Sequence, residues 1–278
     1  MPELPEVETV RAGLAGAVQG KRLVAVEQRR KDLRVPFPEG FAAKLSGRRL
    51  IEVARRGKYL LWHFDDGTVL IAHLGMSGRM MVRHGPAAAA GSHEHVVFRF
   101  EDGTWVTFAD PRRFGLMTLT TKDAANDHPL LAAMGPEPLE DGFDAAYLAG
   151  AFHGKKSPLK NALMDQHLIA GLGNIYVCEA MFRARLSPFR AAGSLKGPAV
   201  ARLVAAIKAV LKDAIAAGGS SLRDYRKASG ELGDFQHRWD AYGREGKKCP
   251  GCRPSWRCTV VREVQGGRST FYCPRLQV

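Results

Sequence analysis

The sequence predicts a multidomain α+β protein: an amino-terminal antiparallel β-sandwich with a leading helix, a helical domain, and a carboxy-terminal β-hairpin that carries cysteines. Three observations support this prediction. Runs rich in Val, Leu, Phe and Trp fill the first part of the chain, helical periodicity replaces them later, and four of the five cysteines lie in the last 30 residues. A chain of 278 residues is long enough for two ordinary domains and an appendage.

The first domain is expected over residues 1–122. Apolar residues from Val7 to Val18 recur at helical spacing before Gly20, which predicts one leading helix. β-type runs then flank Asp66-Gly67 and Asp102-Gly103, and Asp-Gly pairs favour tight hairpin turns. Consecutive hairpins without intervening helices favour an antiparallel sandwich or barrel. The segment 85–91 is interpreted as a flexible connection between strands.

A linker rich in Gly and Pro is expected over residues 123–142, followed by a helical domain over 143–236. The apolar stripe from Val200 to Ile215 recurs at spacings typical of a packed helix and ends at Gly218-Gly219. Upstream, the glycines of 171–174 predict a tight turn between two helices. The N–H groups at such a helix start are suited to bind phosphate. A dinucleotide site is disfavoured because no strand precedes the turn.

The last module, expected over residues 237–278, combines a Cys-x2-Cys pair with a predicted hairpin, 259–264 and 268–272 around Gln265-Gly266-Gly267. Thiolates around Zn²⁺ can replace a core too small to fold alone, so a zinc-ribbon-like finger is predicted; reduced thiols without metal are the alternative. Eight Lys/Arg against two Glu give residues 244–275 a net charge of +6, which suits phosphate contact. Cys178, in an apolar helical stretch, is expected to be a buried packing residue.

The composition predicts a folded protein with a basic surface, because a net charge of +13 accompanies 45% hydrophobic residues. A polyanion is the natural partner, and nucleic acid is favoured over an anionic membrane surface. The chain shows no apolar run of the ~18 to 20 residues that span a bilayer, and its acidic start lacks the order of a secretory signal. A cytoplasmic location is expected, where cysteines bind metal more often than they form disulfides.

The first residues carry a possible nucleophile. If Met1 is removed, Pro2 becomes a terminal secondary amine with Glu3 beside it. An α-amino group titrates near ~7.7 to 8, so part of it is unprotonated at neutral pH and able to add to a sugar carbonyl carbon as an imine. The plainer interpretation is the solvated first turn of a helix.

With these pieces in place, the chain resembles the bacterial formamidopyrimidine-DNA glycosylases, also called 8-oxoguanine DNA glycosylases. The resemblance runs from end to end over six motifs: 2–8 PELPEVE, 56–60 RGKYL, 73–78 HLGMSG, 110–115 DPRRFG, 173–176 GNIY and 267–273 GRSTFYC. It implies an amino-terminal β-sandwich, a helix-two-turn-helix domain and a carboxy-terminal zinc finger that together bind DNA.

The resemblance also implies roles for individual residues. Pro2 would attack C1′ of the damaged nucleotide, and Glu3 would assist opening of the sugar. Lys58 and Arg268 would donate protons during β- and δ-elimination, so that one site acts as glycosylase and lyase. Taken alone, Lys58 is more simply a strand-end charge and Arg268 a phosphate contact.

Further matched positions would contact the DNA. Chemistry on a base requires that it leave the stack, and the vacated space would be filled by Met76, Arg112 and Phe114. Met76 and Phe114 would otherwise be interpreted as core residues. His93, Lys155 and Asn174 match DNA-contact positions, although His93 alone is equally an ordinary surface histidine. The segment from Ser220 to Gly233 matches a region that covers the extruded base.

The finger departs from the family pattern, Cys-x2-Cys-x16-Cys-x2-Cys. Twenty residues separate the second and third matching cysteines, Leu276 stands at the last ligand position, and the lengthened loop contains an additional cysteine. A rearranged zinc site is therefore hypothesised, with the ligands Cys249, Cys252, Cys258 and Cys273. The alternative is a finger with little metal that is held by packing alone.

Two competing functions remain at this point. An endonuclease VIII-like enzyme would prefer oxidised pyrimidines, but the set of Met76, Arg112 and Phe114 favours oxidised purines. A non-catalytic DNA-binding protein would not require Pro2 and Glu3 at the terminus. We therefore expect a base-excision repair enzyme that binds double-stranded DNA with oxidised purines or abasic sites. It is expected to be a monomer, to have no membrane partner, and to associate with the nucleoid.

Overall fold

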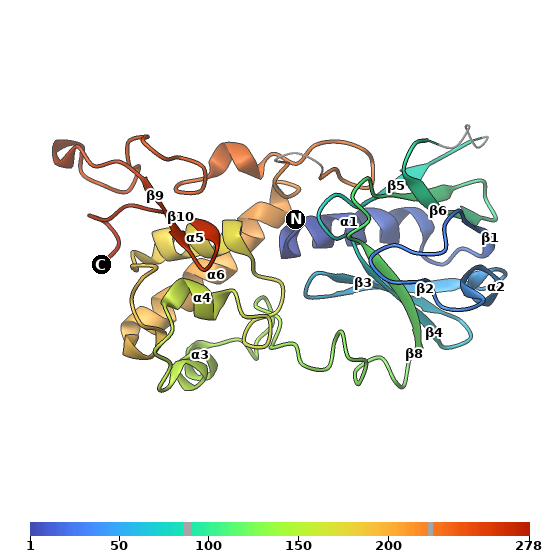
Figure 1. Cartoon of the computed structure of the whole chain (residues 1–278), viewed down its shortest axis with the longest axis horizontal. Coiled ribbons are helices and arrows are strands. Elements are labelled where there is room, and N and C mark those ends of the chain that lie inside the picture. Colours follow the sequence, from blue (N-terminus) through green and yellow to red (C-terminus); the bar gives the residue numbers. More distant parts are fainter. Residues whose placement is uncertain (86–90, 222–224) are drawn as a thin grey trace. The chain divides into compact units, whose positions relative to one another are not determined.

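The computed structural model describes residues 1–85, 91–221 and 225–278, and the chain divides into two compact units (Figure 1). The first unit consists of Met1–Ala133 and Ala217–Gln236, and the second of Met134–Ala216 and His237–Val278. Residues 217–236 thus return to the first unit after the long helix of the second. The predicted fold class is confirmed; the predicted domain limits at residues 122, 142 and 236 stay predictions.

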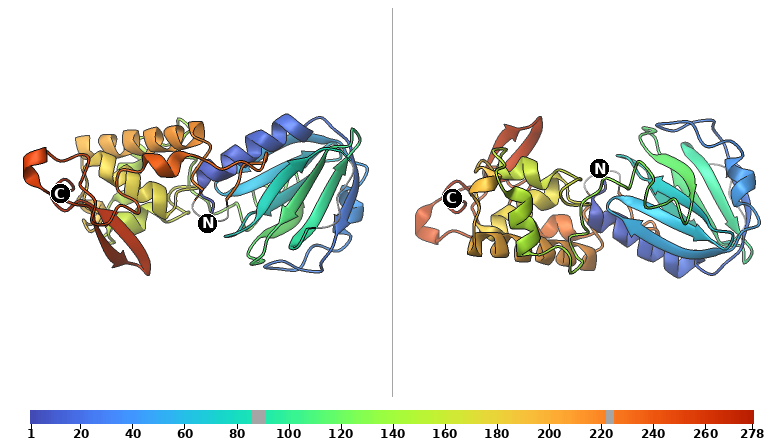
Figure 2. Two further views of the ribbon diagram at one scale, coloured as in Figure 1. Left: turned by 90° about the horizontal axis from the view of Figure 1, so that it is seen from above. Right: turned by 90° about the horizontal axis from the view of Figure 1, so that it is seen from below.

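The first unit contains two four-stranded antiparallel sheets and the leading helix (Figure 2). One sheet has the order β1-β6-β7-β5 and the other β2-β3-β4-β8. Both predicted hairpins form, β3 with β4 and β6 with β7, and Gly67 and Gly103 adopt the positive φ that their turns need. The elements are α1 Leu4–Val18, β1 Leu23–Gln28, α2 Phe41–Leu45, β2 Leu50–Arg56, β3 Tyr59–Phe64, β4 Thr68–His73, β5 Arg79–Arg83, β6 Glu94–Phe100, β7 Trp105–Ala109 and β8 Leu116–Thr121.

The core of this unit lies between the sheets and α1. The predicted apolar face of α1 is fully buried, and Trp62 packs on Phe98 with ring centroids 4.9 Å apart. Tyr225 and Ala228, from the segment that returns to this unit, belong to the same core. A Cβ added at Gly13 of α1 would lie 2.8 Å from the Ala228 side chain, so this glycine allows the returning segment to approach the helix closely.

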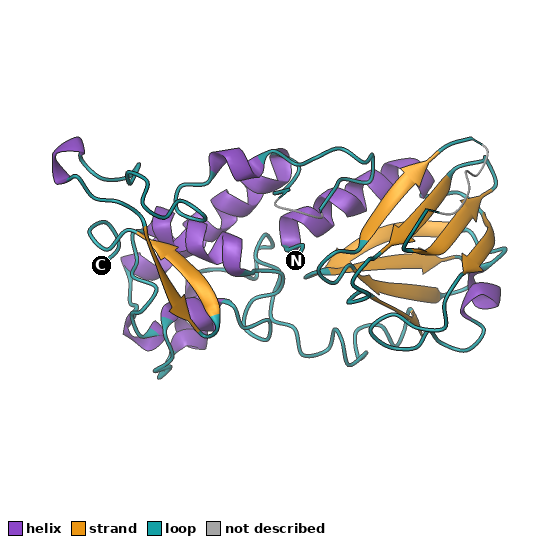
Figure 3. Cartoon of the chain, turned by 45° about the horizontal axis from the view of Figure 1, so that its top comes forward, coloured by secondary structure: helices purple, strands orange, loops and turns teal. Residues whose placement is uncertain are grey.

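The second unit is helical apart from one hairpin (Figure 3). The stripe predicted from residue 200 is buried on α6, which packs on α5. Cys178 on α5 is fully buried, as predicted. The elements are α3 Ala145–Phe152, α4 Leu159–Leu163, α5 Asn174–Ala184, η1 Ala192–Ser194, α6 Pro198–Ala216 and η3 Pro254–Trp256, with η2 at Phe235–Arg238 where the chain passes between units.

The carboxy-terminal hairpin pairs β9 Val261–Gln265 with β10 Arg268–Tyr272. The sequence predicted a three-residue turn, but Gln265 is a strand residue that pairs with Arg268, so the turn consists of Gly266 and Gly267 alone. Both glycines have positive φ, which the tight turn requires.

Of the segment interpreted as a flexible connection between strands, residues 86–90 lie outside the described part of the structure. Among the residues that are described, no helix is long and apolar enough to cross a membrane.

Candidate functional site

Pro2 and Glu3 lie at the start of α1, where both are buried. Glu3 is the residue before the first helical turn, and its backbone N–H donates to Glu6 Oε2 at 2.8 Å. This contact satisfies one of the N–H groups that a helix start leaves unpaired. Pro2 and Glu3 thus occupy an ordered, buried position, which suits an amine at Pro2 that must meet a substrate atom at a fixed place.

Glu6 also holds the segment that returns to the first unit. Its Oε1 accepts a hydrogen bond of 2.7 Å from the backbone N–H of Ser220, and a Cβ at Gly219 would approach the same oxygen to 2.9 Å. Ser221 is anchored in turn, because its N–H donates to Gln236 Oε1 and its hydroxyl accepts from Gly233 N–H. The start of the segment expected to cover the extruded base is thus tied to α1; its residues 222–224 are outside the described structure.

Lys58 lies in the turn between β2 and β3 and is 8% exposed. His73, at the end of β4, pairs with Tyr59 next to it, with ring centroids 4.8 Å apart. Burial lowers the pKa of His73 to about 4, and the positive charges of Lys58 and Arg34 contribute to this shift. His73 is therefore neutral at physiological pH.

Two loops in close backbone contact carry Met76, Arg112 and Phe114. All three are exposed, with Met76 39% and Phe114 45% accessible, which is unusual for large apolar side chains. The guanidinium of Arg112 lies 4.8 Å from the centre of the Phe114 ring. The loops touch at backbone level, since a Cβ at Gly75 would lie 2.4 Å from the Phe114 carbonyl carbon.

Asp110 holds these loops together from beneath and is fully buried. Its carboxylate accepts from the hydroxyl of Ser77 and from the N–H of Gly115, and the Ser77 hydroxyl accepts from Arg112 N–H at 3.2 Å. His93 is exposed nearby, at a positive φ of 68°, and its carbonyl accepts from Asp110 N–H at 3.0 Å. The structure therefore brings Met76, Arg112 and Phe114 onto one supported loop pair, with His93 on a third loop that is hydrogen-bonded to it.

The second unit carries the remaining predicted residues. Arg268 is the exposed first residue of β10, and Asn174 is the first residue of α5. The Asn174 amide donates to the carbonyl of Ser269, the neighbour of Arg268, at 3.0 Å. Lys155, in the loop after α3, is half-buried, and its carbonyl accepts from Gly193 N–H. Asn174 and Arg268 are thus adjacent, whereas Lys155 belongs to a neighbouring loop.

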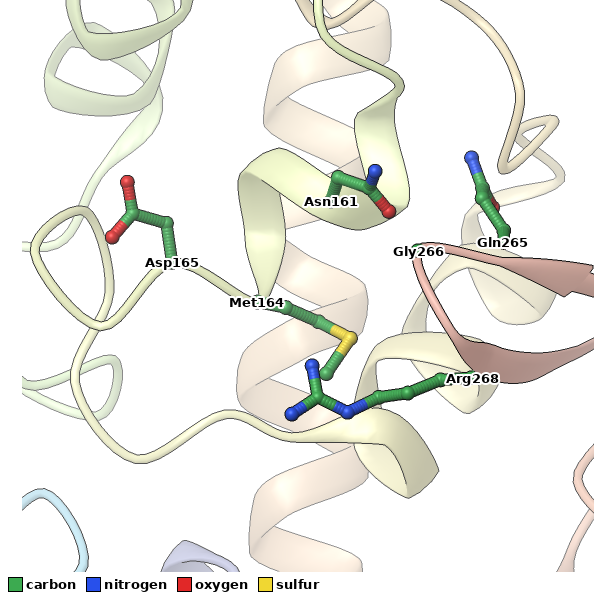
Figure 4. Close-up of a pocket in the computed structure, with 6 residues that line it drawn as sticks. All are labelled: Asn161, Met164, Asp165, Gln265, Gly266 and Arg268. Carbon is green, nitrogen blue, oxygen red and sulfur yellow. The ribbon is translucent and has the colours of Figure 1, made fainter.

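Arg268 forms one wall of a polar hollow of about 270 Å³. Figure 4 shows its guanidinium beside Met164, with Asn161 and Asp165 on α4 and the loop that follows it. The hairpin turn at Gly266 completes the wall, since a Cβ there would lie 3.4 Å from the Asn161 amide oxygen. An arginine that projects from a hairpin into an open polar hollow is placed to bind a phosphate group.

The four cysteines of the last module form one cluster. The Sγ atoms of Cys249, Cys252, Cys258 and Cys273 all lie within 4.8 Å of one another, and those of Cys252 and Cys273 are 3.6 Å apart. Four sulfurs at Zn–S distances of ~2.3 Å in a tetrahedron are about 3.8 Å apart. Burial and the neighbouring thiols raise the pKa of Cys252, so this sulfur would bind as a thiolate only with a cation beside it. The donor set fits a zinc ion.

Cys258 reaches the cluster because the lengthened loop folds back. Its carbonyl accepts from Cys249 N–H at 3.0 Å, and Lys248 and Thr259 form a β-bridge beside this bond. Leu276 packs against the apolar side of the cluster, where a Cβ at Gly251 would meet its methyl group at 2.6 Å. The residue at the family's last ligand position has become a packing residue.

Sequence reasoning missed three supporting residues. Glu6 and His73 lie within quoted motifs but were given no role, and Asp110 was treated as part of a motif only. A buried acid at a helix start, and an Asp before a Pro-Arg-Arg turn, are weak signals in a sequence. The importance of Asp110 and Glu6 depends on distant partners, Ser77 for Asp110 across 33 positions and Ser220 for Glu6 across 214.

A β-sandwich that opens on a buried proline, together with a helical unit that carries a basic hairpin and a four-cysteine cluster, is the architecture of a DNA glycosylase of the helix-two-turn-helix class. Family models identify the two halves separately. The formamidopyrimidine-DNA glycosylase N-terminal domain matches residues 1–117, and the formamidopyrimidine-DNA glycosylase H2TH domain matches residues 134–226. The chain belongs to the formamidopyrimidine-DNA glycosylase family, and the protein is a DNA-repair glycosylase.

Individual relatives match this chain over nearly the whole length of both sequences. The formamidopyrimidine-DNA glycosylase of Rhodospirillum rubrum is 54% identical over 282 residues and covers 100% of both chains. The crystal structure of the MutM (Fpg) protein from Thermus thermophilus has a TM-score of 0.86 and 43% identity, over 99% of this chain and 98% of that one. The Lactococcus lactis Fpg in complex with DNA containing an abasic site has a TM-score of 0.88 and 32% identity, over 99% of both chains.

Proposed function

We propose that this glycosylase excises oxidised purines, 8-oxoguanine and formamidopyrimidines, from double-stranded DNA and then cleaves the strand at the abasic site. The observation that supports this most directly is the ordered, buried start of α1, which holds Pro2 and Glu3 beside the carboxylate of Glu6. The Lactococcus lactis relative was solved with abasic-site DNA and with Fapy-dG DNA, and family membership carries that substrate class to this chain as a proposal.

The first chemical step assigned to the site is attack of the Pro2 amine on C1′. The bond between C1′ and the base breaks, and the base leaves with the bonding electrons and takes up the proton that the amine loses. Glu3 assists opening of the sugar ring by donating a proton to the ring oxygen as the C1′–O4′ bond breaks. The product is a positively charged imine on the Pro2 nitrogen. Because Met1 would occupy this nitrogen in an amide bond, the reaction requires removal of Met1.

Strand cleavage follows from the same imine. Its positive charge acidifies the adjacent sugar protons. Loss of one proton expels the phosphate on one side, and loss of a second proton expels the phosphate on the other side. Lys58 in the first unit and Arg268 in the second are assigned to supply protons and to stabilise the departing phosphates. The neutral state of His73 adds no positive charge beside Lys58.

The exposed set of Met76, Arg112 and Phe114 is assigned to the space vacated by the damaged base. Two apolar side chains separate the neighbouring bases, and the planar guanidinium meets the orphaned partner base. His93, Lys155 and Asn174 are assigned to the phosphate backbone. A basic surface of this kind suits a monomer that associates with DNA in the cytoplasm, at the nucleoid.

We further infer that one structural zinc ion is held by Cys249, Cys252, Cys258 and Cys273. The four sulfur atoms lie close enough for tetrahedral coordination. The ion would supply no chemistry to the reaction. It would fix the finger that carries β9 and β10, and through it Arg268.

The proposal is tested first by borohydride trapping on a duplex with 8-oxoguanine opposite cytosine. The natural chain is compared with Pro2→Gly and with a form that retains Met1. We expect an adduct that maps to Pro2, none with Met1 retained, and slower base release for Pro2→Gly, because a primary amine replaces the ring nitrogen. A duplex with an oxidised pyrimidine serves as the substrate control. Tight binding without an adduct, from a protein with a free proline terminus, would reject the chemistry and leave a DNA-binding protein.

A further inference from the structure

Lys160 on α4 is fully buried, with 0% of its surface exposed, and the proposed chemistry does not use it. Lysine is almost never buried in this way without an anionic partner. The hydrogen bonds of Lys160 are to neutral groups, no carboxylate among the described residues pairs with it, and the buried thiol of Cys178 lies nearby. Burial lowers the pKa of this lysine, the neighbouring Cys178 partly offsets that shift, and the positive charge of Arg268 adds to it. Because removing an ammonium group from water costs free energy, the burial of Lys160 requires an explanation.

The ammonium of Lys160 is bound to the beginning of β10. Its Nζ donates to the carbonyl of Ser269 at 3.0 Å and to the hydroxyl of Thr270 at 2.8 Å. The Thr270 hydroxyl in turn donates to Gln265 Oε1 at 3.3 Å, and Gln265 Nε2 donates to the carbonyl of Pro188. The backbone N–H of Lys160 donates to the same carbonyl at 3.3 Å, which closes a ring between α4 and both strands of the hairpin.

This ring of hydrogen bonds involves the two residues of β10 that directly follow Arg268. Ser269, whose carbonyl accepts from Lys160, is the next residue, and the Asn174 amide donates to the same carbonyl. The side chain of Arg268 extends on the open side, into the hollow that Asn161 and Met164 line (Figure 4). The backbone of the strand is held on its buried side by two donors, and the guanidinium is presented on the other.

We propose that Lys160 is a positioning residue for Arg268: its buried ammonium fixes the first residues of β10, so that the guanidinium is held where a phosphate of the bound strand arrives. The inference rests on the proposed role of Arg268 in DNA binding and strand cleavage. It adds a residue that touches no substrate and acts through its neighbour.

Physical chemistry separates this role from simple stabilisation. Replacing a buried charge by an apolar side chain of similar size is often neutral or stabilising, because the desolvation cost disappears. In this case the substitution also leaves few orphaned groups, since Asn174 still bonds the Ser269 carbonyl and Gln265 still bonds the Thr270 hydroxyl. A purely structural position would therefore tolerate methionine, whereas a positioning residue would not.

The test measures single-turnover strand cleavage on a duplex with a preformed abasic site. Lys160→Met, Arg268→Ala and the double variant are compared with the wild type, and Lys212→Met on the exposed surface of α6 is the matched control. We expect Lys160→Met to slow elimination by roughly 10- to 100-fold, as for a misplaced catalytic group, with unchanged zinc content and melting temperature. In the Arg268→Ala background it should slow the reaction by less than about twofold.

Wild-type cleavage by Lys160→Met, or a loss that multiplies with that of Arg268→Ala, would overturn the inference. If Lys160→Met loses zinc or fails to fold, Thr270→Val decides instead. That variant keeps the contact to Ser269 and removes one of the two acceptors, so a severalfold loss that depends on Arg268 is expected, and a wild-type rate would refute the positioning role.

Failure of the proposed chemistry is detected separately. It would appear as a wild-type protein that forms no adduct at Pro2. In that case the same four proteins are compared by their affinity for a duplex with a stable abasic-site analogue. Lys160→Met should then weaken binding only when Arg268 is present, and equal weakening in both backgrounds would reject the inference.

Discussion

At the scale of single residues, the site depends on charges whose state is set by burial. His73 ends β4 and lies near Lys58 in the turn between β2 and β3, and burial keeps His73 neutral at neutral pH. The two carboxylate oxygens of Glu6 each accept a backbone hydrogen bond, one from Glu3 at the helix start and one from Ser220 in the returning segment. These side chains hold others in place, and their roles follow from their partners more than from their own chemistry.

The first prediction concerns acid stability. The pKa of His73 is lowered from 6.5 to about 4 in the folded protein, so between these values the unfolded chain binds the extra proton and the folded chain does not. Stability is therefore lost as pH falls from 6.5 towards 4, by up to roughly 3 kcal/mol from this group. His73→Asn keeps an acceptor for the Gly75 N–H and removes the titration.

Urea unfolding at pH 7.5 and pH 4.5 measures this effect. The variant should lose markedly less stability than the wild type on acidification, while His153→Gln, at an exposed position, should behave like the wild type. An identical pH dependence in wild type and His73→Asn would show that His73 is not held neutral by the fold.

At the scale of elements, loops and strands that lie far apart in the chain meet in small, closely fitted contacts. The two loops that carry Met76 and Phe114 touch at Gly75, where no side chain fits. In the finger, the loop that contains Cys258 folds back on Cys249, and Leu276 is a packing residue beside the cysteines. The lengthened loop thus brings Cys258 into the four-cysteine cluster.

The finger gives the second prediction. Cys258→Ser should reduce bound zinc from about one ion per chain to a small fraction, because three thiolates bind the ion far less tightly than four. Metal analysis of the purified proteins, followed by titration with a chelator, measures this. DNA affinity and strand cleavage should fall with the zinc, since Arg268 is carried by the finger.

The matched control is Cys178→Ala, which removes a cysteine that lies outside the cluster on α5. It should retain its zinc. Full zinc content in Cys258→Ser would show that Cys258 is not a ligand and that the finger is held by other means.

At the scale of the whole molecule, the net charge of +13 is distributed over two compact units that both carry predicted DNA contacts. Binding to DNA is then driven largely by release of counterions from phosphates, and it weakens as salt increases. Sequence-independent affinity of this kind allows a repair enzyme to scan undamaged DNA before it meets a lesion.

The third prediction follows from this argument. Lys155→Ala should weaken binding to damaged and undamaged duplexes by similar factors, and it should reduce the slope of log K against log salt by about 1, since one phosphate contact is lost. Fluorescence anisotropy between low and moderate salt measures the slope. Lys212→Ala on α6 should leave both quantities unchanged. Selective loss of lesion binding by Lys155→Ala would assign this lysine to the lesion instead of the backbone.

The sequence by itself determined the leading helix, both Asp-Gly hairpins, the α6 stripe and the cysteine hairpin, because each depends on periodicity or turn residues within a short window. It also determined the family, through motifs that stand in order along the chain. The roles of the matched site residues stay predictions.

Only the tertiary structure decided which residues support them. Glu6 meets Ser220 across 214 positions, and Lys160 meets Ser269 across 109. Such contacts arise when separate elements pack together, and their energy comes from burial and paired polar groups that no local pattern records. The sequence motifs therefore predict which residues form the site, whereas only the fold shows which residues hold them in position.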